Sequence, residues 1–130
     1  MIYKGGGDAN LCNKSGASPL YIASYYGHKD CVEFLLNKGG EVNKCDNKGV
    51  SPLYVASDKG HINILEMIYN RGGDVNLCNK SRVPPLHIAS YNGHEDCVEF
   101  LLNKGADVRK YNKNGTSPMY IASKKDFFIL

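Results

Sequence analysis

Histidines and cysteines are the residues of this 130-residue chain whose types could bind a metal or form disulfides. There are four histidines and five cysteines, and two sets of them recur at one constant interval: His28, His61 and His94, and Cys12, Cys45 and Cys78. Such a recurrence places like side chains in successive packed units, about 8–10 Å apart. A metal–ligand bond of ~2 Å and the ~7 Å Cα limit of a disulfide are both shorter than that spacing. We therefore expect no metal site and no disulfide between the recurring residues.

The sequence also lacks the motifs that accompany catalysis or cofactor binding. It contains no Ser/His/Asp arrangement, no phosphate-binding P-loop and no G-x-G-x-x-G fingerprint. No Cys-x-x-Cys pair accompanies the recurring cysteines. We therefore predict that the chain is not an enzyme and binds no cofactor.

Charge and hydropathy exclude several classes of partner. The formal net charge is +3 and the isoelectric point is about 8.5, below the value above ~9 that is typical of nucleic-acid-binding domains. No apolar run approaches the ~20 residues of a membrane span, and Lys4 and three glycines come too early for a secretion signal. The odd number of cysteines favours a reducing compartment. We expect a cytoplasmic protein, with the nucleus as the alternative, no nucleic-acid binding and no membrane insertion.

The elements that must position these residues repeat along the whole chain. Four prolines stand at the same interval as the histidines, at Pro19, Pro52, Pro85 and Pro118. The segments around them read Ser-Pro-Leu-Tyr-Ile-Ala-Ser, Ser-Pro-Leu-Tyr-Val-Ala-Ser, Pro-Pro-Leu-His-Ile-Ala-Ser and Ser-Pro-Met-Tyr-Ile-Ala-Ser. A shift by two intervals also aligns most of the overlapping positions, which indicates that a two-unit segment was duplicated.

This pattern resembles the ankyrin-repeat family, whose unit of about 33 residues carries the motif T-P-L-H-x-A. Serine usually replaces the threonine here and tyrosine replaces the histidine, except at His87, while Pro84 takes the place of the serine in the third unit. The resemblance covers essentially the whole chain. It implies an all-α fold, an ankyrin-repeat solenoid of stacked helix-turn-helix units joined by β-hairpin-like loops.

Helix signals within each unit agree with that architecture. Serines before the prolines are expected to cap the first helix, with proline at its first position; they are Ser18, Ser51 and Ser117. Glycines are expected to end that helix in a left-handed turn, at Gly27, Gly60 and Gly93. A second helix is expected over 29–38, 62–71 and 95–104, apolar nearly all round like a helix buried between neighbours. One unit cannot bury its own apolar face, so stacking must supply the core.

The resemblance gives structural roles to two sets of recurring polar residues. In the family, the histidine at the entry to the second helix is a structural hydrogen-bonding residue, which implies that role for His28, His61 and His94. The family's loop asparagine bridges loop backbones, and it can also be a hydroxylation substrate. The matching positions are Asn10, Asn43 and Asn76, for which we favour the structural role.

We predict one ankyrin-repeat domain over residues 1–130, with a partial unit at each end. The full units cover 15–47, 48–80 and 81–113, and the partial units cover 1–14 and 114–130. The last unit departs from the pattern at Asp126, where glycine is expected, and an apolar tail follows over 127–130. Two interpretations stay open. The chain is a slice of a longer array, which we favour, or its uncapped ends associate head to tail.

The resemblance places a protein partner on a concave face formed by the hairpin tips and the last turn of each first helix. The implied tip contacts are Lys14, Ser15, Ala17, Asn47, Lys48, Val50, Lys80, Ser81, Val83, Lys113, Asn114 and Thr116. The implied helix contacts are Tyr25, Tyr26, Asp58, Lys59, Tyr91, Asn92, Lys124 and Lys125. Residue types at these positions differ between units, whereas the scaffold positions repeat.

Tyrosines and lysines dominate this set of positions, with few acids. A tyrosine buries a large area at little entropic cost, and lysines steer an acidic partner. We therefore predict a protein–protein interaction module, a scaffold or adaptor, that binds another protein or a peptide with an acidic stretch. The alternatives are a regulatory or targeting segment of a larger enzyme or channel, and a structural tether within a longer array.

Overall fold

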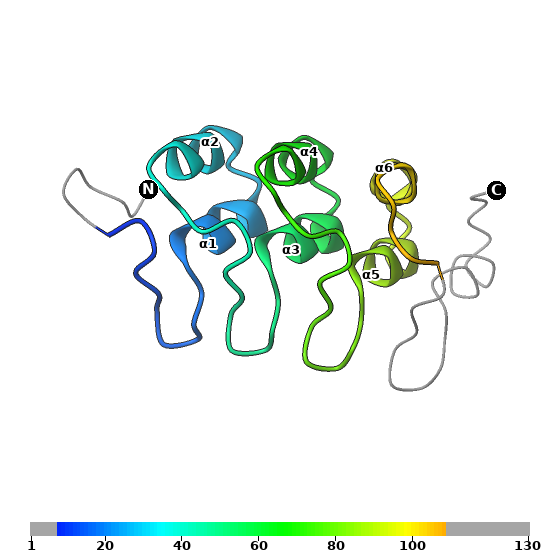
Figure 1. The fold of residues 1–130 in the computed structure, drawn as a ribbon, viewed down its shortest axis with the longest axis horizontal. Helices are drawn as coiled ribbons and strands as arrows, with labels where there is room; N and C mark the ends of the chain where they lie inside the picture. Colours follow the sequence, from blue (N-terminus) through cyan, green and yellow to red (C-terminus); the bar gives the residue numbers. More distant parts are fainter. Residues whose placement is uncertain (1–7, 109–130) are drawn as a thin grey trace.

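The computed structural model describes residues 8–108, which form a row of helix pairs joined by long loops (Figure 1). The pairs are α1 (Pro19–Tyr26) with α2 (Lys29–Asn37), α3 (Pro52–Lys59) with α4 (Ile62–Asn70), and α5 (Pro85–Tyr91) with α6 (Glu95–Asn103). Helices α1, α3 and α5 make one layer, and α2, α4 and α6 make the other. The loops project from the side of the first layer. The expected all-α solenoid of helix-turn-helix units is confirmed.

The start of each first helix follows from the Ser-Pro pair. The Ser18 hydroxyl accepts a hydrogen bond from the Tyr21 N–H at 3.1 Å, and the Ser51 hydroxyl accepts one from the Tyr54 N–H at 3.0 Å. Both predicted N-caps are therefore confirmed, whereas Ser117 lies outside the described residues. In the third unit, Pro84 occupies the N-cap position of α5 and makes no side-chain capping bond.

Glycine ends the first helix in two of the described units. Gly27 and Gly60 follow α1 and α3 with φ of 77° and 74°, as expected. The expectation for the third unit is wrong by one residue, because Asn92 caps α5 with φ −87° before Gly93 takes φ 75°. The physical reason is that the Gly93 N–H donates to the Ser90 carbonyl, three residues back, whereas the N–H groups of Gly27 and Gly60 donate to carbonyls four residues back.

The core lies between the two layers and between neighbouring pairs. Three positions of each unit are almost fully buried, with at most 1% of each residue exposed: Leu20, Leu53 and Leu86; Val32, Leu65 and Val98; Leu35, Ile68 and Leu101. Each of these side chains contributes ~1.5–3 kcal/mol relative to an exposed one. Because the positions recur at the interval of the prolines, stacking joins them into one continuous core.

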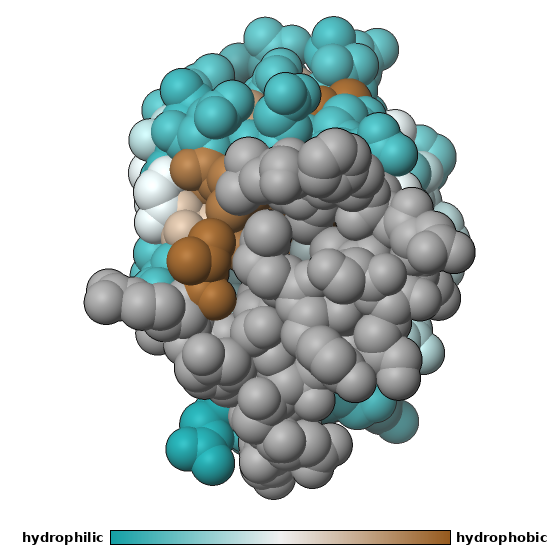
Figure 2. Space-filling model, turned by 90° about the vertical axis from the view of Figure 1, so that its right-hand side faces the viewer, coloured by the Kyte–Doolittle hydropathy of each residue, from teal (hydrophilic) through white to brown (hydrophobic). Residues whose placement is uncertain are grey.

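The second helices are not apolar all round, so that expectation is wrong. In α2, Val32 and Leu35 are buried, but Glu33 and Asn37 are exposed and Phe34 is 39% exposed. Only the sides that face the first layer and the neighbouring units are covered, and the outer side meets solvent. In the view of Figure 2, the surface at the level of this layer is mostly hydrophilic.

Recurring histidines join each unit to the one before it. Nε2 of His61 lies 3.2 Å from the Tyr25 carbonyl oxygen, and Nε2 of His94 lies 2.9 Å from the Asp58 carbonyl oxygen. Each ring thus meets the end of the preceding first helix, where backbone carbonyls lack a helical partner. The structural role expected of His61 and His94 is confirmed.

Recurring asparagines join each loop to the next. The Asn43 side chain donates to the Gly72 carbonyl at 3.1 Å and accepts a hydrogen bond from the Asp74 N–H at 3.0 Å. Asn10 and Asn76 each make the same pair of hydrogen bonds to the loop that follows them. The bridging role expected of these asparagines is confirmed.

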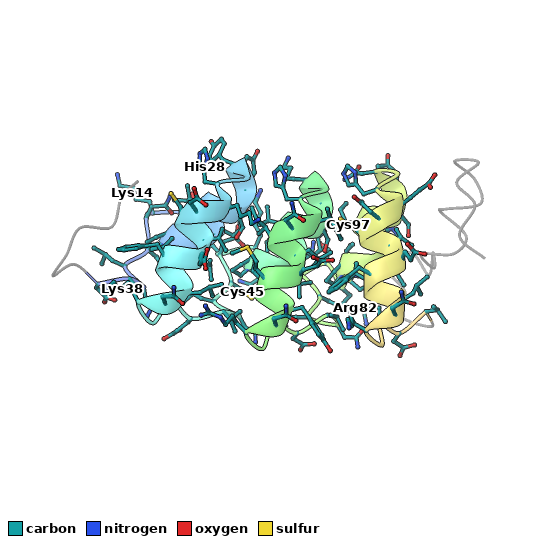
Figure 3. All side chains as sticks on the ribbon, turned by 90° about the horizontal axis from the view of Figure 1, so that it is seen from above. Lys14, His28, Lys38, Cys45, Arg82 and Cys97 are labelled. Carbon is teal, nitrogen blue, oxygen red and sulfur yellow. The ribbon has the colours of Figure 1, made fainter. Side chains whose placement is uncertain are left out.

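The five cysteines are free thiols distributed along the array, and Figure 3 labels two of them, Cys45 and Cys97. Cys97 is buried in α6, and the other four are partly buried. Among residues 8–108, no three histidine, cysteine or acidic side chains gather into a group that could hold a metal ion. Within the same range, no helix has the length and apolar character needed to cross a membrane.

Candidate protein-interaction surface

An open hollow of about 590 Å³ lies between the first two hairpin tips and α1. The loops project beside α1 (Figure 1), which brings together residues of two successive units. The lining includes all eight predicted contacts of this region: Lys14, Ser15, Ala17, Tyr25, Tyr26, Asn47, Lys48 and Val50. Four residues outside the predicted set complete it: Asn13, Tyr21, Ile22 and Asp46.

Three tyrosines of α1 form the aromatic side of this hollow. The ring centroids of Tyr25 and Tyr26 lie 4.8 Å apart, and those of Tyr21 and Tyr25 lie 6.4 Å apart. Tyr26 is 64% exposed and Tyr25 is 37% exposed, so both present ring surface to solvent. Lys59 Nζ lies 4.5 Å from the Tyr25 ring centroid, a cation–π contact between the first and second units. The aromatic side is therefore arranged by contacts within the chain itself.

Tyr21 connects α1 to the second hairpin. Burial raises the pKa of Tyr21 to about 12, aided by the charge of Asp46 and by a hydrogen bond to that carboxylate. One unit further along, the Asn79 side chain donates to the Tyr54 hydroxyl at 3.3 Å. Burial also raises the pKa of Tyr54 to about 12. Tyr21 and Tyr54 occupy the position at which the motif T-P-L-H-x-A has histidine. In the sequence, their contact with the next hairpin was indicated only by that replacement.

Two of the predicted helix-end contacts bind each other. The Asn92 side chain donates to the Asp58 carboxylate at 2.7 Å and to the Asp58 carbonyl at 3.0 Å. A partner that used either residue would have to compete with this pair. Tyr91, beside Asn92, is 50% exposed and presents ring surface to solvent.

Backbone hydrogen bonds join the hairpin tips into a row. The Asn47 N–H donates to the Ser15 carbonyl and the Lys80 N–H donates to the Lys48 carbonyl, each at 3.0 Å. These tip side chains are exposed, as Lys14 and Ser81 are. Ala17 is only 5% exposed, and Val50 and Val83 are half-buried, so these three form the base of the tips.

Sequence reasoning missed Arg82, which shares the third tip with Lys80 and Ser81. Gly16 and Gly49 occupy the same place in the first two tips. The change from glycine to arginine in the third tip was the feature of the sequence that could have identified this residue.

The remaining predicted contacts lie outside the described residues: Lys113, Asn114, Thr116, Lys124 and Lys125. The segments 1–7 and 109–130, which the head-to-tail interpretation requires, lie outside them as well.

Helix pairs stacked at a constant period, with hairpin loops on one side, define a solenoid repeat protein. A family model described as ankyrin repeats in three copies matches residues 1–79 and 66–128. The chain therefore belongs to the ankyrin-repeat family. Ankyrin repeats are generally protein-interaction modules and are typically not catalytic. No curated protein matches the chain.

Proposed function

We propose that the chain is a scaffold or adaptor module that binds a segment of another protein along a concave strip. The strip consists of the hairpin tips 14–17, 47–50 and 80–83 and the helix ends 25–26, 58–59 and 91–92. The observation that carries this proposal is the hollow of about 590 Å³, in which two tips and the tyrosines of α1 meet. Its concave shape, with apolar rings and a few polar groups, is typical of binding sites.

Tyr25, Tyr26 and Tyr91 are the proposed anchors. They are 37%, 64% and 50% exposed, so each has ring surface left to bury against a partner. A tyrosine has few rotatable bonds, which keeps the entropic cost of fixing it low. Buried aromatic anchors commonly carry about 2 kcal/mol or more of the free energy of binding.

The charge of the tips supports an acidic partner segment. Within 14–17, 47–50 and 80–83 there are no acidic residues and four basic ones: Lys14, Lys48, Lys80 and Arg82. Asp46 precedes the second tip and Asp58 is one of the helix-end residues of the strip, and both already accept hydrogen bonds within the array. Basic groups at the rim of an interface mainly raise the association rate and make it depend on salt.

The test is simultaneous replacement of Tyr25, Tyr26 and Tyr91 by alanine. A partner captured with the wild-type chain is purified, and its affinity for each variant is measured by calorimetric titration. We expect the affinity to fall by at least ~30-fold, which corresponds to one anchor of ~2 kcal/mol. The far-ultraviolet circular dichroism should match that of the wild type, because the anchors lie outside the core.

The matched control is Phe34→Ala, which removes a partly exposed aromatic ring from α2, in the layer formed by α2, α4 and α6. It should leave the affinity for the partner unchanged. Unchanged affinity in the triple tyrosine variant would show that the partner binds elsewhere on the chain.

A further inference from the structure

Arg82 has the left-handed backbone conformation that glycine adopts at the same place in the first two tips. Its φ is 63°, and it is the one non-glycine residue with positive φ between residues 8 and 108. Gly16 and Gly49, in the same place in the first two tips, each have φ of 77°. Left-handed backbone disfavours a side chain because Cβ approaches the following carbonyl oxygen. Arginine therefore stands here against the preference of the backbone.

Packing between tips gives a second reason for glycine at this place. A Cβ added to Gly49 would lie 2.9 Å from the Lys80 backbone nitrogen, in the next tip. Tips stacked in this way leave no room for a side chain. Arg82 keeps the left-handed backbone of Gly16 and Gly49 in the third tip but has a side chain there.

No contact within the described range accounts for the arginine. Its side chain is exposed, and its guanidinium makes no hydrogen bond or ion pair with residues 8–108. Its backbone N–H donates to the Asn79 carbonyl, and Gly16 and Gly49 make the equivalent bond in their own tips. Strained backbone of this kind clusters at ligand-binding positions.

Arg82 also makes the third tip the most basic of the three. The first two tips contain one lysine each, whereas the third contains Lys80 and Arg82. The hydrogen bond from the Lys80 N–H to the Lys48 carbonyl makes the second and third tips direct neighbours. Figure 3 shows Arg82 in the third unit, toward the other end of the row from Lys14.

We propose that Arg82 is a partner-contacting residue that binds a carboxylate of an acidic segment crossing the hairpin tips. This inference rests on the proposed function and assigns the two ends of the strip different roles. Tyr25 and Tyr26 at the first unit would anchor an apolar part of the segment, and Arg82 with Lys80 would bind its acidic part. A guanidinium presents paired N–H groups that match both oxygens of a carboxylate, which an ammonium cannot do.

The test is fluorescence titration with a short labelled peptide of consecutive glutamates, at low salt and at physiological salt. Arg82→Gly restores the residue of the other tips and removes one charge, whereas Arg82→Lys keeps the charge. The matched control, Lys38→Ala, removes one charge at the end of α2, in the other layer (Figures 1 and 3).

At physiological salt, Arg82→Gly should weaken peptide binding about fivefold. Arg82→Lys should fall between that variant and the wild type. Lys38→Ala should change binding by less than about twofold, because a distant charge is screened beyond ~8 Å. The thermal midpoint of Arg82→Gly should equal or exceed that of the wild type, since glycine accepts the left-handed conformation.

Each of the following results would overturn the inference. Failure of the wild type to bind the glutamate peptide at low salt would show that the tips form no binding site for an acidic segment. Equal weakening by Arg82→Gly and Lys38→Ala would indicate general charge attraction. A lower thermal midpoint for Arg82→Gly would mean that the arginine stabilises the fold. A peptide in which one phosphoserine is the only charged side chain is titrated in parallel. Binding tighter than that of the glutamate peptide, and dependent on Arg82, would mean that Arg82 binds phosphate rather than carboxylate.

The tyrosine variant separates this inference from the proposed function. Unchanged partner affinity in the triple tyrosine variant would refute the strip itself. Loss of partner affinity in that variant, together with unaffected glutamate binding by Arg82→Gly, would refute only the role of Arg82.

Discussion

Replacement of Asn43 by alanine should weaken the coupling between successive loops. The Asn43 amide makes two hydrogen bonds to the next loop, to Gly72 at 3.1 Å and from Asp74 at 3.0 Å. A hydrogen bond of this kind contributes ~1 kcal/mol net. Because Asn43 is exposed, water replaces part of what is lost. We therefore expect the free energy of unfolding to fall by ~1–2 kcal/mol, and the thermal midpoint to fall by ~4–7 °C.

The assay is urea denaturation followed by circular dichroism. Asn63→Ala is the matched control, because Asn63 is exposed on α4 and its side chain makes no hydrogen bond within residues 8–108. Alanine favours helix, so the control should be unchanged or slightly more stable. Equal stabilities for the two variants would refute the idea that the asparagine bridges couple the units. A split transition in Asn43→Ala would show in addition that the units unfold separately.

Three further predictions follow from the caps and the buried titratable groups. Ser51→Ala should lower the free energy of unfolding by ~1 kcal/mol in urea denaturation, because the Tyr54 N–H loses its cap, whereas Ser81→Ala at an exposed tip should not. Burial, aided by the charge of Asp96, raises the pKa of the Cys97 thiol to about 12. Cys97 should therefore react with thiol reagents more slowly than the other cysteines until urea unfolds the chain. Equal reaction rates in the native state would contradict its burial. Burial raises the pKa of Tyr54 from 10.0 to about 12, so the folded chain holds that proton more tightly than the unfolded chain. The stability that Tyr54 contributes through this proton is therefore complete below about pH 10 and is lost as the pH rises toward 12. Tyr54→Phe should reduce the slope of the free energy of unfolding against pH in that window.

The parts of the fold that depend on local sequence could be predicted. The Ser-Pro pair at Ser18 and Pro19 indicates a helix start wherever it occurs, because the cap and the first-turn proline act within one turn. The recurrence at a constant interval then indicates that like units stack, which places Leu20 and its counterparts in one core.

The rest depends on distances between units, which periodicity alone does not determine. The Tyr21 contact with Asp46 joins a helix to the next hairpin, and the Asp58–Asn92 pair joins two helix ends. Arg82 was missed because the predicted contacts were carried over by position, and the first two tips have Gly16 and Gly49 at that position. The outer side of α2 was misjudged because its residue types alone do not show which side faces solvent, where Phe34 lies.

Photo-crosslinking tests the central claim, that the concave strip is the binding surface, most directly. A photoreactive phenylalanine analogue is placed either at Tyr26, on the strip, or at Phe34, on α2; these side chains are 64% and 39% exposed. Both variants are irradiated with the purified partner, and the covalent product is quantified by mass spectrometry. If the partner binds the strip, position 26 should crosslink to it and position 34 should give no crosslink above background. A crosslink from position 34, with none from position 26, would contradict it.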